Sequence, residues 1–266
     1  MDEARIEASL EEALALRDSG RVLDALEGFQ RLQEPTADPE KKAVLLLNEV
    51  TCYMILERFG DARQRLDEAS RKIPADSALW LSVEYTDACL MKEEGKPEEA
   101  LDKLEKLLSC NPGLSRDQER SYLYEEIQQR RAALLYQLGE NEKVIPLLEE
   151  VLSFEMSPGD RSRNLCILAC CCRTLHRYER AKELYLEARE IGVPENWEGR
   201  VHWDLGITHY HLREFGKAKQ EFLLCERGIA GYGIPVFDLY GWLSATCSAL
   251  GEKIEAARYA QLSKPS

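Results

Sequence analysis

The chain has 266 residues and an acidic composition, which together exclude several classes of protein. It contains 35 lysine and arginine residues against 48 aspartate and glutamate residues, a formal net charge of −13. Such a charge repels nucleic-acid phosphates and anionic lipid surfaces, so we expect neither nucleic acid nor a membrane as a partner. Apolar residues make up 44% and charged residues 31% of the chain, without an apolar run long enough to span a membrane, which is typical of a soluble helical protein.

The first residues of the chain and its cysteines indicate in which cellular compartment the protein resides. Residues Met1 to Arg5 are acidic and lack the basic-then-apolar order of a signal peptide. The nine cysteines are an odd number without paired spacing. This favours a reducing environment, in which free cysteine behaves as a small buried hydrophobe. We therefore expect a cytoplasmic protein without a disulfide framework.

One helical pattern recurs along the chain. A small or β-branched residue is followed four positions later by an apolar residue and seven positions later by another small or apolar residue, which places all three on one face of a helix. In chain order these triplets are Ala25-Phe29-Leu32, Ala62-Leu66-Ala69, Ala100-Leu104-Leu107, Val144-Leu148-Val151, Ala181-Tyr185-Ala188, Ala218-Phe222-Cys225 and a degenerate Ala256-Ala260-Ser263. Their first members lie 37 to 44 residues apart. The pattern therefore covers nearly the whole chain.

Each triplet predicts the second helix of an antiparallel helical hairpin closed by a short turn. The seven predicted hairpins cover approximately residues 6–37, 43–75, 77–112, 116–156, 158–193, 195–230 and 235–266. The fourth begins with Ser115 and Gln118, which have the spacing of a capping box, so we expect a longer first helix there. Ser157, followed by Pro158 and Asp160, predicts the start of the fifth hairpin.

The sixth hairpin carries a family resemblance. Leu205-Gly206 in its first helix, with Ala218 and Phe222 in its second, resembles the tetratricopeptide repeat. That family often has glycine five residues before the small residue, as at Gly20, Gly95, Gly139 and Gly251, and proline twelve residues after it, as at Pro74 and Pro112. The chain departs from the family in the longer spacing of its repeats and in having the Leu-Gly pair of the first helix only at Leu205-Gly206. The resemblance implies an all-α fold, a right-handed α-solenoid of about seven antiparallel helix pairs forming a single repeat domain over 1–266.

The resemblance also implies where a ligand binds. In this family the first helices line a concave groove, and the groove positions, counted from Gly206 as position eight, hold Tyr85, Lys92, Gln129, Tyr136, Arg163, Arg173, Arg200, Trp203, Tyr210 and His211. Aromatic and arginine side chains supply contact area and charge-assisted hydrogen bonds at protein interfaces. Residues 161–230 hold 12 basic and 10 acidic side chains, a net of +2 in an otherwise acidic chain. We expect a peptide segment, acidic or ending in a carboxylate, to bind there, and a solvated face without a partner is the alternative.

A cysteine cluster in the fifth hairpin suggests a different function. Cys166 and Cys170 share a helix face, whereas Cys171 and Cys172 point towards other neighbours. A structural zinc site needs four converging ligands, usually from two elements. We therefore interpret the cluster as small-residue packing and keep a metal or redox module as a lesser alternative.

The histidines and the motifs give no sign of catalysis. His202 and His209 are seven residues apart on one face, and His211 points elsewhere. No H-E-x-x-H pattern, nucleophile elbow, phosphate-binding loop or dinucleotide fingerprint is present. We therefore predict a protein that is not an enzyme, with no catalytic residue, cofactor or metal.

The C-terminal hairpin suggests the second candidate function. The chain stops at Ser266 with no additional polar helix after this hairpin. We therefore expect Phe237, Tyr240 and Trp242 to be exposed. A homodimer formed through the C-terminal repeat is the alternative to a protein-binding scaffold.

Overall fold

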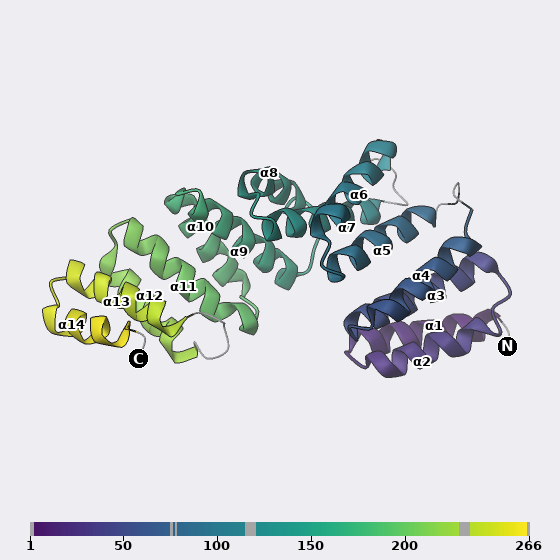
Figure 1. Cartoon of the computed structure of the whole chain (residues 1–266), viewed down its shortest axis with the longest axis horizontal. Helices are drawn as coiled ribbons and strands as arrows, with labels where there is room; N and C mark the ends of the chain where they lie inside the picture. The colour runs from purple at the N-terminus through teal and green to yellow at the C-terminus, as the bar shows by residue number, and fades with distance from the viewer. Residues whose placement is uncertain (1–2, 75–76, 78, 115–120, 229–234, 265–266) are drawn as a thin grey trace. The chain divides into compact units, whose positions relative to one another are not determined.

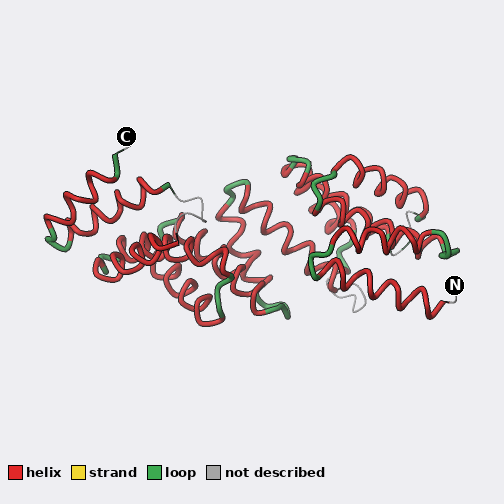
Figure 2. The backbone as a smooth tube through the Cα atoms, turned by 90° about the horizontal axis from the view of Figure 1, so that it is seen from below, coloured by secondary structure: helices red, strands yellow, loops and turns green. Residues whose placement is uncertain are grey.

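A computed structural model gives the fold and describes residues 3–74, 77, 79–114, 121–228 and 235–264. Over these residues the chain forms fourteen α-helices and no strand, as the sequence predicts (Figures 1 and 2). None of the described helices combines the length and the apolar character needed to cross a membrane. The predicted capping box at Ser115 and Gln118 lies outside the described residues.

The helices belong to two compact units, residues 1–138 and 139–266. The first unit contains α1 (Glu3–Asp18), α2 (Val22–Gln33), α3 (Pro39–Ile55), α4 (Phe59–Lys72), α5 (Trp80–Glu93), α6 (Pro97–Cys110) and α7 (Ser121–Gln137). The second contains α8 (Asn141–Val151), α9 (Pro158–Thr174), α10 (Tyr178–Ile191), α11 (Glu195–His211), α12 (Phe215–Gly228), α13 (Val236–Ala249) and α14 (Lys253–Leu262).

Consecutive helices pack as hairpins inside each unit. The pairs are α1 with α2, α3 with α4, α5 with α6, α9 with α10, α11 with α12, and α13 with α14. The two helices of the predicted fourth repeat, α7 and α8, fall in different units. The fourth hairpin, the single domain over 1–266 and the handedness of a superhelix therefore stay predictions.

The predicted stripes on the second helices form the core. Phe29, Leu66, Leu104, Tyr185 and Phe222 are each at most 2% exposed. The small residues that begin these triplets are fully buried as well, which allows the paired helix to approach closely. The degenerate last triplet fits less well, since only its first member, Ala256, is buried.

The Leu-Gly pair of the sixth hairpin has a steric explanation. A Cβ atom added to Gly206 would lie 2.5 Å from Cε1 of Phe222, nearer than real Cβ contacts come. The ring of Phe222 on α12 thus occupies the space that a side chain on α11 would need.

The hairpin turns share one backbone conformation. A residue with positive φ follows each first helix, and these residues are Gly20, Glu57, Gly95, Gly139, His176, Arg213 and Gly251. In six of the turns the next amide donates to a carbonyl five residues back, for example Glu214 N to His209 O at 2.9 Å. This bond is typical of the Schellman motif that ends helices. The four glycines were predicted as turn residues, whereas three turns place a residue with a side chain there.

Candidate functional site

A buried carboxylate joins the arginines of the fifth and sixth hairpins. Asp204 on α11 is 1% exposed. Its Oδ1 lies 3.1 Å from Nε of Arg173 on α9, and its Oδ2 accepts a hydrogen bond of 2.8 Å from Nε of Arg200. The hydroxyl of Tyr185 on α10 donates to the same Oδ2 at 3.1 Å. Three helices therefore converge on one carboxylate, and we call Arg173, Arg200, Asp204 and Tyr185 the Asp204 cluster.

Charge within the Asp204 cluster is unequal, with two guanidinium groups and one carboxylate. Burial alone would lower the pKa of Arg173, but the neighbouring Asp204 raises it above its ordinary value. Burial, and then Asp204, raises the pKa of Tyr185 well above its ordinary value, so this phenol stays protonated. The Arg173 side chain is 18% exposed, whereas that of Arg200 is 45% exposed. Of the two guanidinium groups, that of Arg200 is therefore the more accessible.

Arg163, the third predicted arginine, does not belong to the cluster. It stands ten residues before Arg173 on α9, a rise of about 15 Å along the helix. Its Nη2 donates to Asp160 Oδ1 in the first turn of the same helix at 2.8 Å. The structure thus brings Arg173 and Arg200 together and places Arg163 at the other end of α9.

The predicted aromatic residues of α11 belong to a larger aromatic group in the second unit. The ring centroids of His211 and Tyr178 are 4.4 Å apart and stacked. Tyr210 meets Trp242 edge-on at 5.1 Å, and Trp203 meets Phe222 at 6.1 Å. Trp242 and Tyr240 are half-buried, so the prediction that they are exposed is wrong, because both pack onto this core from α13. Phe237 is 45% exposed, as predicted.

Two histidines that suggested chemistry are held by carboxylates of the α11–α12 hairpin. His202 Nδ1 lies 2.6 Å from Glu221 Oε2, and Arg189 Nη1 donates to the other oxygen of Glu221 at 2.8 Å. His209 Nδ1 lies 2.7 Å from Glu214 Oε2. The first contact joins α11 to α12, and the second joins α11 to the turn that follows it, so both are contacts that hold the hairpin together.

The cysteine cluster of α9 is inside the protein. Cys166, Cys170, Cys171 and Cys172 are all buried, and none of the four is in a disulfide bond. Burial, with a smaller effect of Asp204, raises the pKa of Cys166 to about 12. The thiol is therefore protonated at neutral pH, and the thiolate is the form that binds metals and reacts.

Potential metal ligands converge at another place among the described residues. Atoms of Cys247, Glu252 and Glu255 lie within 4.8 Å of one another. The ammonium group of Lys219 contacts both carboxylates, with Nζ at 2.6 Å from Glu252. A lysine therefore already supplies positive charge where a metal ion would, so this group carries no metal site.

The predicted groove residues of the first unit lie on α5 and α7. The hydroxyl of Tyr85 donates to Glu126 Oε2 at 3.0 Å, and Lys92 pairs with the adjacent Glu93. Gln129 and Tyr136 are half-buried on α7. These four residues belong to the first unit, whereas the Asp204 cluster belongs to the second. They are therefore separate candidate sites.

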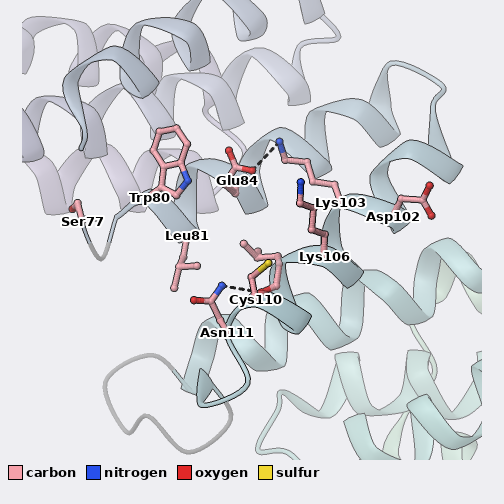
Figure 3. Close-up of a pocket in the computed structure, with 10 residues that line it drawn as sticks. Ser77, Trp80, Leu81, Glu84, Asp102, Lys103, Lys106, Cys110 and Asn111 are labelled. Carbon is pink, nitrogen blue, oxygen red and sulfur yellow. Dashed lines mark hydrogen bonds and ion pairs between the residues drawn. The ribbon is translucent and has the colours of Figure 1, made fainter. Parts of the chain in front are cut away.

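Sequence reasoning missed a pocket of about 740 Å³ beside α5 and α6 (Figure 3). Its wall includes the indole of Trp80 and four charged side chains, Glu84, Asp102, Lys103 and Lys106. Two acids and two bases give this wall no net charge. It therefore shows no preference for an anion or a cation.

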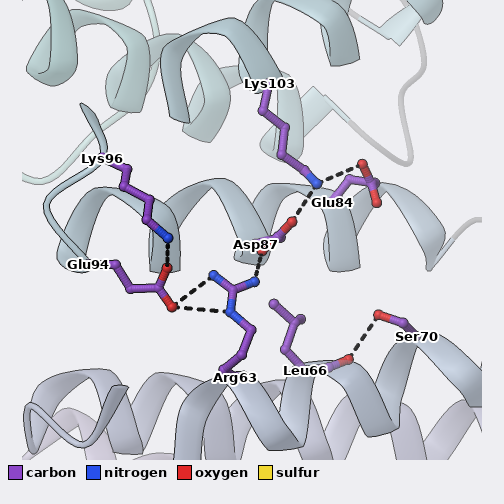
Figure 4. Close-up of polar contacts among 8 residues, drawn as sticks. All are labelled: Arg63, Leu66, Ser70, Glu84, Asp87, Glu94, Lys96 and Lys103. Atoms are coloured by element: carbon purple, nitrogen blue, oxygen red, sulfur yellow. Dashed lines mark hydrogen bonds and ion pairs between the residues drawn. The ribbon is translucent and has the colours of Figure 1, made fainter. Parts of the chain in front are cut away.

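Charged residues also connect α4, α5 and α6 behind this pocket (Figure 4). Arg63 on α4 pairs with Asp87 and Glu94 of α5, and Lys103 on α6 pairs with Asp87 and Glu84. Burial alone would raise the pKa of Asp87, but the hydrogen bonds from Lys103 and Arg63 lower it. Lys96 also pairs with Glu94, so three basic and three acidic side chains balance one another. The network therefore stabilises the packing of α4, α5 and α6 and carries no net charge.

Comparisons with solved structures show the fold. The chain is similar to the signal transduction ATPase with a tetratricopeptide repeat sensor from Pyrococcus horikoshii, with a TM-score of 0.73 and 18% identity over 98% of this chain and 42% of that one. It is similar to the C-terminal part of a TPR repeat-containing protein from Cytophaga hutchinsonii (TM-score 0.62, 13% identity, 96% and 93% covered). It also resembles PilF from Pseudomonas aeruginosa (TM-score 0.62, 17% identity, 84% and 91% covered). No protein-family model matches the sequence, and the search of curated proteins gave no match.

Proposed function

We propose, from the fold that the chain shares with tetratricopeptide-repeat proteins, that it is a non-enzymatic scaffold or adaptor of the cytoplasm that binds a segment of a partner protein. The observation that carries the proposal is the charge of the Asp204 cluster. Both arginines contact Asp204, and the side chain of Arg200 is 45% exposed, so a carboxylate of a partner can reach Arg200 while Asp204 stays in place. An aspartate or glutamate side chain, or a C-terminal carboxylate, has the charge and the planar geometry that guanidinium groups recognise.

The same arrangement favours affinity through preorganisation. Arginine side chains lose rotamer freedom when they bind a partner, which weakens binding. Here Asp204 already fixes Arg173 and restrains Arg200. The aromatic side chains of Trp203, Tyr210 and His211 lie on the same helix as Arg200 and would supply contact area. Arg163 remains a candidate contact within the second unit, and Tyr85, Lys92, Gln129 and Tyr136 remain a separate candidate site of the first unit.

The experiment is a pull-down from a cytoplasmic extract with three single variants. Arg200→Gln removes the accessible charge of the cluster, and Arg163→Gln tests the other end of α9. Arg180→Gln is the matched control, because Arg180 lies exposed on the second helix α10 and pairs with Glu183. We expect the partner to be retained by the wild type and by Arg180→Gln and lost from Arg200→Gln at unchanged helicity. Equal retention by Arg200→Gln and the wild type would contradict the site.

Self-association is the second candidate, and exposed apolar residues of the last hairpin favour it. Ile254 is 88% exposed, Phe237 45% and Leu262 42%. Sedimentation at several concentrations separates the two functions. A dimer that dissociates on dilution and is lost in Ile254→Glu supports self-association, whereas a constant monomer mass contradicts it. Trp242 is unsuitable for this test, because it packs against the core.

A further inference from the structure

The second unit has a pocket lined by aromatic rings and an acidic side chain, whereas the Asp204 cluster contains two basic side chains. It has a volume of about 540 Å³ and is bounded mainly by α11 and α13. Its lining residues are Trp203, Phe237, Asp238, Gly241, Trp242, Ala245 and Ser263. Three aromatic rings and one carboxylate therefore surround a single space.

The spacing of residues on α13 explains the hollow. Asp238, Gly241 and Ala245 follow one another by three and four residues, so they share one face of the helix. A Cβ atom added to Gly241 would meet nothing within 4 Å. The small residues at 241 and 245 thus leave room that larger side chains would fill. Asp238 stands at the N-terminal end of this face.

The two indoles of the pocket are held by the core. Trp203 contacts the buried ring of Phe222 edge-on at 6.1 Å, and Trp242 contacts Phe222 at 6.1 Å and Tyr210 at 5.1 Å. Both indoles are only partly buried, so part of each remains at the pocket. Rings fixed in this way need little reordering when a ligand arrives.

Charge decides which ligand suits the pocket. Asp238 is exposed, and within the described part of the chain no lysine, arginine or histidine pairs with it. Aromatic faces attract cations through the ring quadrupole, and a nearby carboxylate adds to this attraction. We propose that this pocket binds a cationic side chain, the ammonium group of a lysine or the guanidinium group of an arginine on a partner protein.

The pocket lies beside the Asp204 cluster, and this predicts a pattern of charges in the partner's sequence. Arg200 and Trp203 are three residues apart on α11, about 5 Å along the helix axis. A segment that used both sites would carry an acidic and a basic residue close together. This pattern rests on the proposed function, whereas the preference of the pocket for cations does not.

The test uses n-butylammonium chloride as the probe and n-butanol as its uncharged control. The chain has four tryptophans, so the indole N–H signals of Trp203 and Trp242 can be followed by NMR beside those of Trp80 and Trp197. We expect butylammonium to shift the first two signals with millimolar affinity and to leave the other two unchanged. Equal shifts with n-butanol would overturn the proposal, because the pocket would then be merely apolar. Absence of any shift would overturn it as well.

Three variants of the full chain complete the test. Asp238→Asn removes the charge at nearly constant shape, and we expect the dissociation constant of butylammonium to rise about fivefold. Gly241→Leu places a large side chain in the pocket, where a Cβ atom meets nothing within 4 Å, and should abolish the shifts, with Gly241→Ala as the smaller control. Unchanged affinity in Asp238→Asn would show that the carboxylate only favours the start of α13 and would contradict the proposal. Arg200→Gln should leave butylammonium binding intact, so failure of this site is distinguishable from failure of the proposed function.

Discussion

The carboxylate of Asp204 links helices of two successive hairpins. Replacing it by asparagine leaves the guanidinium of Arg173, only 18% exposed, without its counter-charge. Loss of one member of a buried ion pair typically costs about 3–5 kcal/mol, so we expect Asp204→Asn to lower the free energy of unfolding by this order. Urea denaturation followed by circular dichroism measures it.

A matched control for this prediction is Asp160→Asn. Asp160 pairs with Arg163, and both side chains are more than 40% exposed. Exposed pairs contribute about 0–1 kcal/mol, so this variant should differ little from the wild type. If both variants lost the same stability, the Asp204 cluster would not be a buried ion pair in solution.

Two glycines in first helices should respond in opposite ways to the same change. At Gly206 a new Cβ atom would meet the ring of Phe222, so we expect Gly206→Ala to destabilise the protein by about 1–3 kcal/mol. At Gly241 the space is open, so Gly241→Ala should stabilise the helix by up to about 1 kcal/mol. Thermal unfolding of the two variants side by side checks both signs. A gain in stability at Gly206 would contradict the close packing of α11 on α12.

The backbone conformation that the hairpin turns share predicts how substitutions in the turns change stability. Arg213 has a φ of +61°, a conformation that costs residues with a Cβ atom about 1–2 kcal/mol relative to the usual helical region. Arg213→Gly should relieve this cost and stabilise the protein by about 1 kcal/mol, offset in part by the greater freedom of glycine in the unfolded chain. Gly95→Arg, at the equivalent turn with φ +81°, should do the reverse. Equilibrium denaturation of both variants measures the pair, and effects of the same sign would disprove the equivalence.

The α11–α12 hairpin should also make stability depend on pH. Burial lowers the pKa of His209 below 6.5, although Glu214 opposes this shift. Burial alone would raise the pKa of Glu214, but hydrogen bonds from Lys217, Lys182 and His209 lower it to about 2. Because the folded protein binds both protons less readily than the unfolded chain, acidification favours unfolding.

The contribution of His209 is therefore complete above pH 6.5 and is lost as the pH falls below that value. The contribution of Glu214 is complete above pH 4.5 and is lost as the pH falls towards 2. We expect His209→Gln to flatten the upper part of a stability profile measured from pH 8 to 4 and to leave the lower part unchanged. Parallel profiles for variant and wild type would exclude His209 as the titrating group.

The hairpins were largely predictable from the sequence, and the partners of their side chains were not. The spacing of Ala218 and Phe222 shows which face of a second helix is buried, because residues four apart lie on the same face of an α-helix. The spacing of Arg200 and Asp204, four residues apart, was a visible signal of an ion pair. That Arg173 joins them depends on how α9 and α11 are rotated against each other, which no periodicity shows. The arginines were therefore predicted as groove residues of first helices, and their internal partner Asp204 was not predicted.

For the whole molecule, damage to one hairpin should stay local. Phe222 is fully buried, and Phe222→Ala should cost about 3–5 kcal/mol through lost contacts and a cavity. In a repeat array each hairpin contacts its neighbours, so the loss should concentrate in α11 to α14. Hydrogen exchange followed by mass spectrometry should show faster exchange there and unchanged exchange in α1 to α4. A uniform increase over the chain would show that the chain unfolds as one cooperative body.

The extent of each unit was not predictable. The regular repeat suggests one domain, whereas the helices of the structure form two compact units that meet in sequence between Leu138 and Gly139. This boundary falls inside the predicted fourth repeat, which has the longest spacing in the chain. The pocket between Trp203 and Asp238 escaped prediction for a related reason, since it depends on the spacing of α11 and α13.

The repeated turn also bears on how the protein folds. Helices inside a unit pack mainly on the next helix or the next but one in the chain, so the contacts join residues that are close in sequence. Short loops close at a small entropic cost, and chains with such low contact order fold fast. Each hairpin can thus form as soon as its own two helices and turn are available, before the rest of the unit exists. During synthesis the first hairpins would then bury their apolar stripes while later ones are still being made.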